Sequence, residues 1–150
     1  MQVRTTHRLI IPAAALALCS GLTPAADDAS RRVINGCTIG PATLCVEFNL
    51  QGAKLRGADM PRSDLSRAQL SGADLRDAMM GPLLLGADRV LPTNLTGAQL
   101  KGSDLTGADV RHAVFVNADL SRSNFTRALL KQADFTSIAR LGSRGLEDVI

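Results

Sequence analysis

The sequence is poor in the side chains that usually carry out catalysis. It has two histidines and three cysteines among 150 residues, and no Trp or Tyr. His112 is the only histidine beyond the first 26 residues, and it has no nucleophile and orienting group beside it in the sequence. No glycine-rich phosphate loop and no cluster of metal-ligand residues is present. We therefore expect a protein that is not an enzyme and that has no catalytic residues, no metal site and no cofactor.

The central part of the chain also lacks the spacing of ordinary helices and strands. From Leu50 to Phe135 an apolar residue stands at every fifth position, and a small residue stands two before most of them. A five-residue step rotates a side chain by about 140° on an α-helix, which leaves no apolar stripe. On an extended strand the same step places successive leucines on opposite faces. The eighteen positions are Leu50, Leu55, Met60, Leu65, Leu70, Leu75, Met80, Leu85, Val90, Leu95, Leu100, Leu105, Val110, Phe115, Leu120, Phe125, Leu130 and Phe135.

A chain that turns once in five residues satisfies this pattern, because each large residue and its small neighbour then point to the same side. Stacked coils of this kind bury one continuous core. The pattern predicts an all-β solenoid. A narrow coil has room for a row of large side chains only if the row opposite consists of small ones. We therefore expect a packed core and no cofactor tunnel.

Several five-residue segments resemble a known repeat. Ala73–Asp77, Ala108–His112 and Ala118–Arg122 are similar to the A-D/N-L-x-x unit of pentapeptide-repeat proteins. The resemblance implies a right-handed, quadrilateral β-helix with four pentapeptides in each coil. Eighteen repeats would then give about four and a half coils, or a column about 20 Å long at the ordinary spacing between strands. We expect this β-helix over residues 50–137, with caps at both ends.

The outward positions of the repeat carry most of the charge. Asp or Asn precedes many of the interior residues, and we expect these side chains to bond to turn backbone. Lys and Arg are interspersed with them, which is typical of a solvated mixed-charge surface. An anionic partner, such as nucleic acid or lipid headgroups, is the alternative interpretation of the arginines. We do not expect a nucleic-acid partner, because no purely basic face is evident.

Residues 1–26 have the features of a signal peptide. Arg4 and Arg8 form a basic start, residues 9–22 an apolar centre, and residues 23–26 a small-residue exit. The apolar run is too short for a membrane span, so we expect no transmembrane segment in the mature chain. Cys19 suggests a lipoprotein signal instead, but Leu18 stands where such signals have a small residue. These features predict a periplasmic or secreted protein with a nearly neutral mature chain.

Residues 27–49 form the expected N-terminal segment and cap. We expect residues 27–36 to be frayed, and Cys37 and Cys45 to form a disulfide. The bond would close a short loop and contribute about 2.5 kcal/mol on the chain-entropy estimate. A metal site is the alternative, but two thiols without a nearby histidine supply only half of a tetrahedral ligand set. A cap is needed here because a solenoid exposes the backbone edge of its first coil.

The repeat is irregular between residues 79 and 92, although the count by fives continues. We expect a local distortion or a small loop that does not break the column. Met79, Leu84 and Leu91 then either form an exposed apolar patch or fold back onto the coil. Val114 and Val116 also depart from the outward-polar rule and are a second candidate interaction surface. Residues 138–150 are expected to cap the last coil, or to pair with a second copy.

The sequence as a whole favours a non-catalytic, exported scaffold of the bacterial envelope. Its partner would be an unidentified protein or a second copy of the chain. The resemblance supplies the alternative, because some pentapeptide-repeat proteins mimic DNA and bind DNA gyrase. A duplex mimic needs a continuous negative field, whereas this surface is close to neutral, and a signal peptide would carry the chain away from gyrase.

Overall fold

The computed structural model describes residues 32–86, 89–138 and 144. The chain divides into two units, Met1–Ser30 and Arg31–Ile150. The first unit lies outside the described residues, and so does nearly all of the segment expected to form a C-terminal cap. The signal peptide and that cap therefore stay predictions, and the description that follows concerns the second unit.

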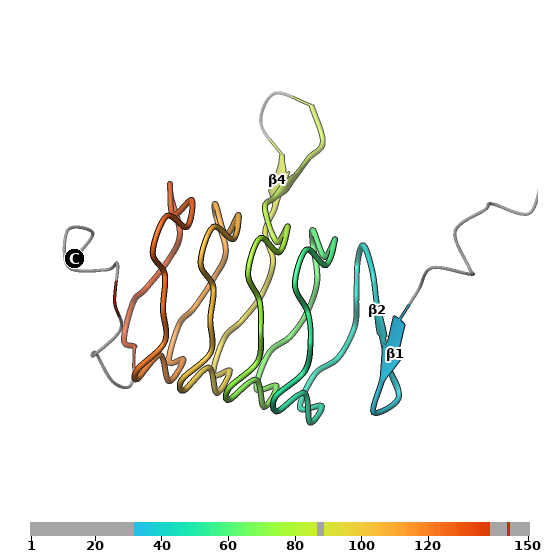
Figure 1. Ribbon diagram of the computed structural model, residues 1–150. Helices are drawn as coiled ribbons and strands as arrows, with labels where there is room; N and C mark the ends of the chain where they lie inside the picture. Colours follow the sequence, from blue (N-terminus) through green and yellow to red (C-terminus); the bar gives the residue numbers. More distant parts are fainter. Residues whose placement is uncertain (1–31, 87–88, 139–143, 145–150) are drawn as a thin grey trace, which may run out of the picture. The chain divides into compact units, whose positions relative to one another are not determined.

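The repeat region forms a column of stacked coils (Figure 1). Parallel bridges join residues twenty positions apart, such as Asn49 with Gln69, and each bridge is supported by a backbone hydrogen bond such as that from Leu50 N to Gln69 O, 2.8 Å. The bridges fall into four rows, which we name faces 1 to 4. Face 1 contains Leu44, Asp64, Asn94, Val114 and Asp134; face 2 contains Asn49, Gln69, Gln99 and Asp119; face 3 contains Lys54, Asp74, Asp104, Asn124 and Arg144; face 4 contains Asp59, Met79, Asp109 and Leu129.

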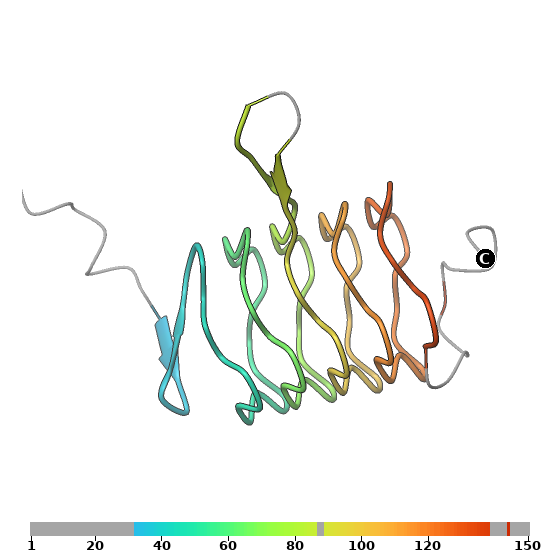
Figure 2. The same ribbon diagram turned by 180° about the vertical axis from the view of Figure 1, so that it is seen from behind.

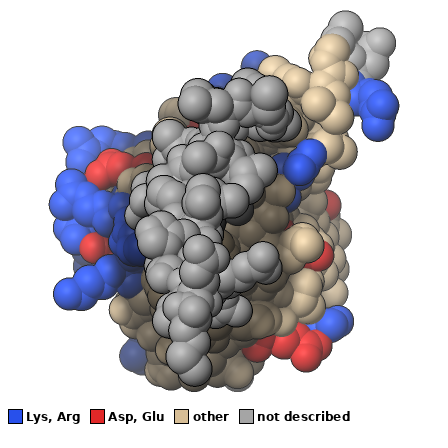
Figure 3. Space-filling model, turned by 90° about the vertical axis from the view of Figure 1, so that its right-hand side faces the viewer, with Lys and Arg blue, Asp and Glu red and all other residues tan. Residues whose placement is uncertain are grey.

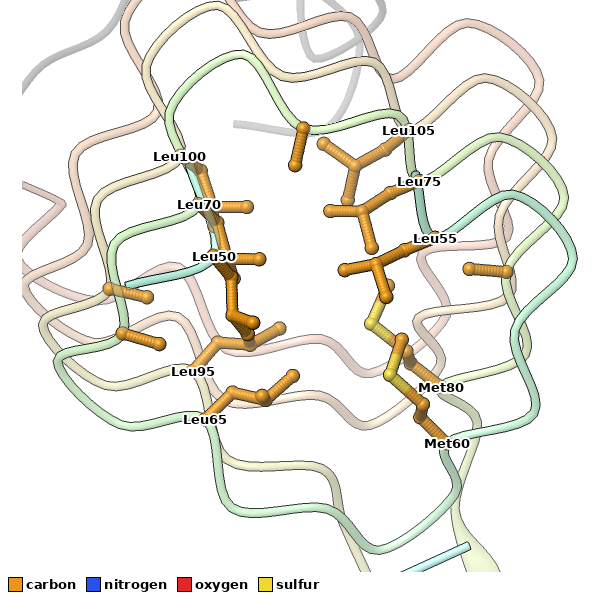
Figure 4. Close-up of a cluster of buried hydrophobic side chains, with 14 of the residues drawn as sticks. Leu50, Leu55, Met60, Leu65, Leu70, Leu75, Met80, Leu95, Leu100 and Leu105 are labelled. Atoms are coloured by element: carbon orange, nitrogen blue, oxygen red, sulfur yellow. The ribbon is translucent and has the colours of Figure 1, made fainter. Parts of the chain in front are cut away.

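The interior is packed as the repeat predicts. Figure 4 shows the large side chains stacked in rows, with Leu50, Leu70 and Leu100 in one of them. These three side chains have no exposed area, and Ala68 and Ala98, two positions before Leu70 and Leu100, are also buried. Near the C-terminal end phenylalanine replaces leucine: Phe115 and Phe135 stack with ring centroids 5.0 Å apart, and Phe125 meets both rings edge-on.

Most corners of the column are turns of one pattern. After Leu50, the amide of Ala53 donates to the carbonyl of Leu50 (3.0 Å), and Gly52 between them has a φ of 64°. A positive φ at the third position of such a turn is the mark of type II. The side chain of Asn49 accepts a hydrogen bond from the amide of Gln51 (3.1 Å). The same bond recurs at Asp64, Asp74, Asn94, Asp104, Asp109, Asp119, Asn124 and Asp134, which confirms the predicted role of these residues.

A hairpin leaves the column between faces 4 and 1 and projects from it in both views (Figure 1 and Figure 2). Its strands, β3 (Leu83–Leu84) and β4 (Val90–Leu91), are antiparallel and pair Leu83 with Leu91 and Leu84 with Val90. Bridges that cross this segment join residues thirty positions apart, such as Asp64 and Asn94, so the coil from Asp64 to Thr93 contains ten additional residues.

The hairpin corrects the predicted interior. Leu85 and Val90 stand at the fifth positions, but their exposed fractions are 41% and 38%. The chain leaves the core after Met80 and returns at Thr93, both of which are fully buried. The column continues, as expected, and of the two expected alternatives the excursion is the small loop. It nevertheless removes two of the eighteen positions from the core, which was not expected.

The chain before the column forms a second hairpin, of β1 (Arg32–Ile34) and β2 (Cys37–Ile39). Asn35 and Gly36 join the strands with φ values of 50° and 83°. Positive φ at both positions is the type I′ turn that Asn-Gly favours, so the prediction that this segment frays is wrong for residues 32–36. Cys37 is bonded to Cys45 with their Cα atoms 5.7 Å apart, which confirms the expected disulfide. The side chain of Asn35 donates to the carbonyl of Asn49 in the first coil (2.7 Å).

Candidate interaction surfaces

The metal-ligand side chains and the interior of the column bear on where a functional site lies. In residues 32–86, 89–138 and 144, no group of three or more His, Cys, Asp or Glu is placed to hold a metal ion. The core is filled with side chains, so any recognition by this part of the chain takes place on its outer surface. No helix in this part is long and apolar enough to cross a bilayer.

The most apolar part of the described surface surrounds the β3–β4 hairpin. We define the hairpin patch as Met79, Leu83, Leu84, Leu85 and Val90. Their exposed fractions are 49%, 37%, 64%, 41% and 38%. Met79 lies on face 4 two residues before Gly81, where the chain leaves the column, so it sits beside the root of the hairpin. Of the predicted residues, Met79 and Leu84 are exposed and Leu91 is half-buried, while Leu83, Leu85 and Val90 were not expected in this surface.

The two valines of the second predicted surface lie on a different side of the column. Val114 is on face 1, where it is bridged to Asn94, two residues after Pro92. Val116 lies in the turn between faces 1 and 2, where its carbonyl accepts from the amide of Gly97 (2.8 Å). Both valines are half-buried. The structure thus brings Val114 toward the root of the hairpin and leaves Val116 at the far edge of face 1.

A second surface is basic and lies on face 3 and the turns on either side of it. Arg76 donates two hydrogen bonds to the carboxylate of Asp74, of 2.8 and 2.6 Å. These bonds lower the pKa of Asp74 to about 2 and raise the pKa of Arg76. Arg56 forms an ion pair with Asp77 at 3.3 Å, and Arg76 also approaches Asp104 at 3.8 Å. The acidic groups of this surface are therefore paired with arginines.

Face 4 has one ion pair of the same local kind. Arg111 donates two hydrogen bonds to Asp109, of 2.9 and 2.7 Å, and lowers the pKa of that carboxyl group. On face 1, hydrogen bonds from Thr136 lower the pKa of Asp134. The partners stand two positions apart in each case, so these pairs follow from the repeat and stabilise the turns.

Comparisons with known proteins agree with the geometry. Residues 47–80 and 93–132 match the family model of pentapeptide repeats, in eight copies, and the gap between the two ranges contains the hairpin. A search of the curated proteins gives no match. Among solved structures, HetL from Nostoc sp. strain PCC 7120, a pentapeptide-repeat protein involved in the regulation of heterocyst differentiation, is 34% identical with a TM-score of 0.57. The alignment covers 61% of this chain and 38% of HetL.

A second similar structure is Rfr23, a pentapeptide-repeat protein from Cyanothece 51142. It is 26% identical with a TM-score of 0.54, and the alignment covers 63% of this chain and 57% of Rfr23. This chain thus spans less than two thirds of either relative. The fold common to these proteins is the right-handed quadrilateral β-helix, and the four rows of bridges described above fit it. The repeats, the four-sided column and the similar structures together show that this chain belongs to the pentapeptide-repeat family.

Proposed function

We propose that this protein is a non-catalytic, exported scaffold of the bacterial envelope that holds a protein partner at the hairpin patch. The observation that carries the proposal is the hairpin itself, which displays three consecutive leucines, Leu83 to Leu85, on a rigid column. Contiguous exposed apolar patches on soluble proteins tend to mark contact sites.

The structure around the patch supports a binding role. A two-stranded hairpin is only marginally stable on its own, and this one is held by its own pairing, which includes the bond from Leu85 N to Arg89 O (2.8 Å). The coil at its root is fixed, because Met80 N donates to Asp109 O at 2.8 Å. The fixed coil thus holds the apolar side chains of the hairpin at a defined place. A partner that covers these side chains removes apolar surface from water.

No observation on the described residues favours the alternative of a DNA-mimicking, gyrase-binding protein. A duplex mimic carries a dense row of negative charges. The described part of this chain has thirteen Lys and Arg against nine Asp and Glu, and its most charged face is basic. A protein partner of different chemistry, or a second copy of the chain, fits the hairpin patch better.

Replacing Met79, Leu84 and Leu85 by serine should abolish partner binding. Cells that express the triple variant are treated with a chemical crosslinker, and the adducts in the envelope fraction are compared with those of the wild type. Self-association is measured on the purified proteins by analytical ultracentrifugation. We expect the variant to lose the specific adducts or the dimer while its thermal midpoint changes by only a few degrees, since the three side chains are at least 41% exposed.

Leu44→Ser with Val46→Ser is the matched control, because these residues are also exposed and apolar but lie in the first coil. The control should keep every adduct of the wild type. Equal loss in both variants would mean that general surface hydrophobicity causes the crosslinks. A large fall in the midpoint of the triple variant would show that the hairpin patch supports the core, and either result would remove the basis of the proposal.

The export part of the proposal has its own test. We expect the protein to appear in the periplasmic or secreted fraction with a mass that lacks about the first 26 residues and two thiol hydrogens, since Cys37 and Cys45 are bonded in the structure. Intact mass spectrometry under non-reducing conditions gives both values at once. A full-length cytoplasmic form with free thiols would contradict export.

A further inference from the structure

The positive charges of the column are concentrated on one side. Of the thirteen Lys and Arg among the described residues, eight lie on face 3, in the two turns that bound it, or against it, whereas only three of the nine Asp and Glu do. Figure 3 shows this concentration on the flank opposite the hairpin. We define the basic face as Arg32, Lys54, Arg56, Arg76, Lys101, Arg122, Arg127 and Arg144, together with Asp74, Asp77 and Asp104.

The backbone pairing places these residues together although they are up to 112 positions apart in the chain. Face 3 itself supplies Lys54 and Arg144. The turn before face 3 supplies Lys101 and Arg122, and stacked bonds such as Gly102 N to Ser121 O (2.9 Å) align it. The turn after face 3 supplies Arg56, Arg76 and Arg127. Arg32 joins from β1, because its guanidinium donates to the carbonyl of Lys54 at 2.6 Å.

Ion pairing removes little of this charge. The three carboxylates of the basic face are engaged by Arg56 and Arg76. Among the described residues, Lys54, Lys101, Arg122, Arg127 and Arg144 form no salt bridge, and all five are exposed. The basic face therefore presents a field of one sign to whatever lies against it.

The shape of the basic face restricts the anion that it fits. Its backbone is a ladder of parallel bridges from Lys54 to Arg144, and the β3–β4 hairpin leaves the column elsewhere, between faces 4 and 1. The basic face therefore has no projecting helix or hairpin that would enter a DNA groove. The basic face also lacks an exposed aromatic platform for bases, since all four phenylalanines are buried or half-buried and the chain has no Trp or Tyr.

We propose that the basic face binds the surface of a membrane that contains anionic phospholipids. A rigid, nearly flat row of unpaired cations can contact many headgroups at once, because lipids diffuse to match the positions of the charges. Lys and Arg near such a surface contribute additively, each by about a fivefold change in partitioning at moderate salt. The hairpin patch lies on another edge of the column, so a membrane-bound molecule keeps it free for a protein partner.

Vesicle sedimentation tests the proposal. The full chain is mixed with vesicles of phosphatidylglycerol and phosphatidylcholine in equal parts, and with vesicles of phosphatidylcholine alone. We expect binding to the anionic vesicles that falls with added salt. Lys54→Gln, Lys101→Gln and Arg127→Gln combined should weaken that binding about a hundredfold, given about fivefold for each residue. Comparison of variants that share residues 1–26 removes any contribution of the apolar segment at residues 9–22 and of Arg4 and Arg8 beside it, since these are the same in every sample.

Arg62→Gln, Arg89→Gln and Lys131→Gln combined is the matched control, since it removes the same charge from outside the basic face. We expect it to weaken binding less than fivefold. Equal losses in the two triple variants, or no preference for anionic vesicles, would overturn the proposal. So would tight binding of a short DNA duplex that the basic-face variant alone abolishes, without vesicle binding. Substitution of the hairpin patch should leave vesicle binding unchanged, so the failure of either proposal is seen separately.

Discussion

Phe125→Ala should lower the free energy of unfolding by about 3–5 kcal/mol, one of the largest effects that a single substitution can have on this protein. The side chain is 1% exposed. Its ring lies edge-on to Phe115 at 5.9 Å and to Phe135 at 6.1 Å, so truncation opens a cavity and breaks two aromatic contacts. The neighbouring rings are themselves held by the stacked backbone and cannot fill the space, because each coil is tied to the next by hydrogen bonds such as Phe115 N to Asp134 O.

Urea unfolding followed by far-ultraviolet circular dichroism measures this loss, since the chain has no Trp or Tyr to report by fluorescence. Leu129→Ala is the control: Leu129 lies on face 4 with 52% of its surface exposed, and its truncation should change the free energy by less than about 0.5 kcal/mol. If Phe125→Ala costs less than about 1 kcal/mol, the last coils are not the packed core that the structure shows.

Removal of the hairpin should leave the column folded and abolish the binding assigned to the hairpin patch. The design replaces residues 82–92 by one glycine. This shortens the chain by ten residues, which changes the thirty-residue spacing of pairs such as Asp64 and Asn94 to the twenty of the other coils. Gly81 is kept because a Cβ there would lie 2.8 Å from an Oδ of Asp109. The added residue is glycine because it takes the third position of the new turn, where the other turns have a positive φ.

The shortened protein should have the circular dichroism spectrum of the wild type and a thermal midpoint within a few degrees of it. It should lose the same crosslinked adducts as the triple serine variant. A fall of the midpoint by more than about 10 °C, which corresponds to a few kcal/mol for a domain of this size, would show that the hairpin stabilises the coils. Retention of the adducts would place the partner elsewhere on the surface.

The fold was predictable because the five-residue spacing of apolar residues is repeated along the chain. A five-residue step is incompatible with a helix and with a continuous strand, so the chain from Leu50 onward had few alternatives. The disulfide was predictable from Cys37 and Cys45, the two cysteines beyond the predicted signal peptide. The β1–β2 hairpin was missed, although Asn35 and Gly36 between short apolar runs were its signal.

The β3–β4 hairpin was not predicted because the length of the insertion is a multiple of the repeat. Ten residues are two repeats, so Leu85 and Val90 keep the count by fives while lying outside the core. The signals that distinguish them are local: Leu83 stands where the interior needs a small residue, and Pro82 and Pro92 flank the excursion. A count of period alone cannot separate an insertion of this length from further repeats.

The same ten residues concealed the basic face. Four repeats make one coil, and the insertion is two repeats long. If coils are counted from Leu50 without allowing for it, every residue after the insertion is assigned to the face opposite its true one. That count places Lys101, Arg122 and Arg127 on the side opposite Lys54, and the charges then look evenly mixed. The bridges from Asp74 to Asp104 and from Asp104 to Asn124 bring the cations onto one side. In a repeat protein, charged residues can therefore be assigned to faces only after the insertions have been located.

Two arginines of the basic face sit in backbone positions that suit glycine. Arg122 and Arg127 have φ values of 60° and 59°, a left-handed conformation that costs a residue with a side chain roughly 1–2 kcal/mol. The turns stacked before Arg122 have Gly52, Gly72 and Gly102 at the corresponding positions. The last coils thus carry their positive charge on residues whose backbone is strained. The end of the column that is richest in unpaired arginine is also the end whose turns hold the most backbone strain.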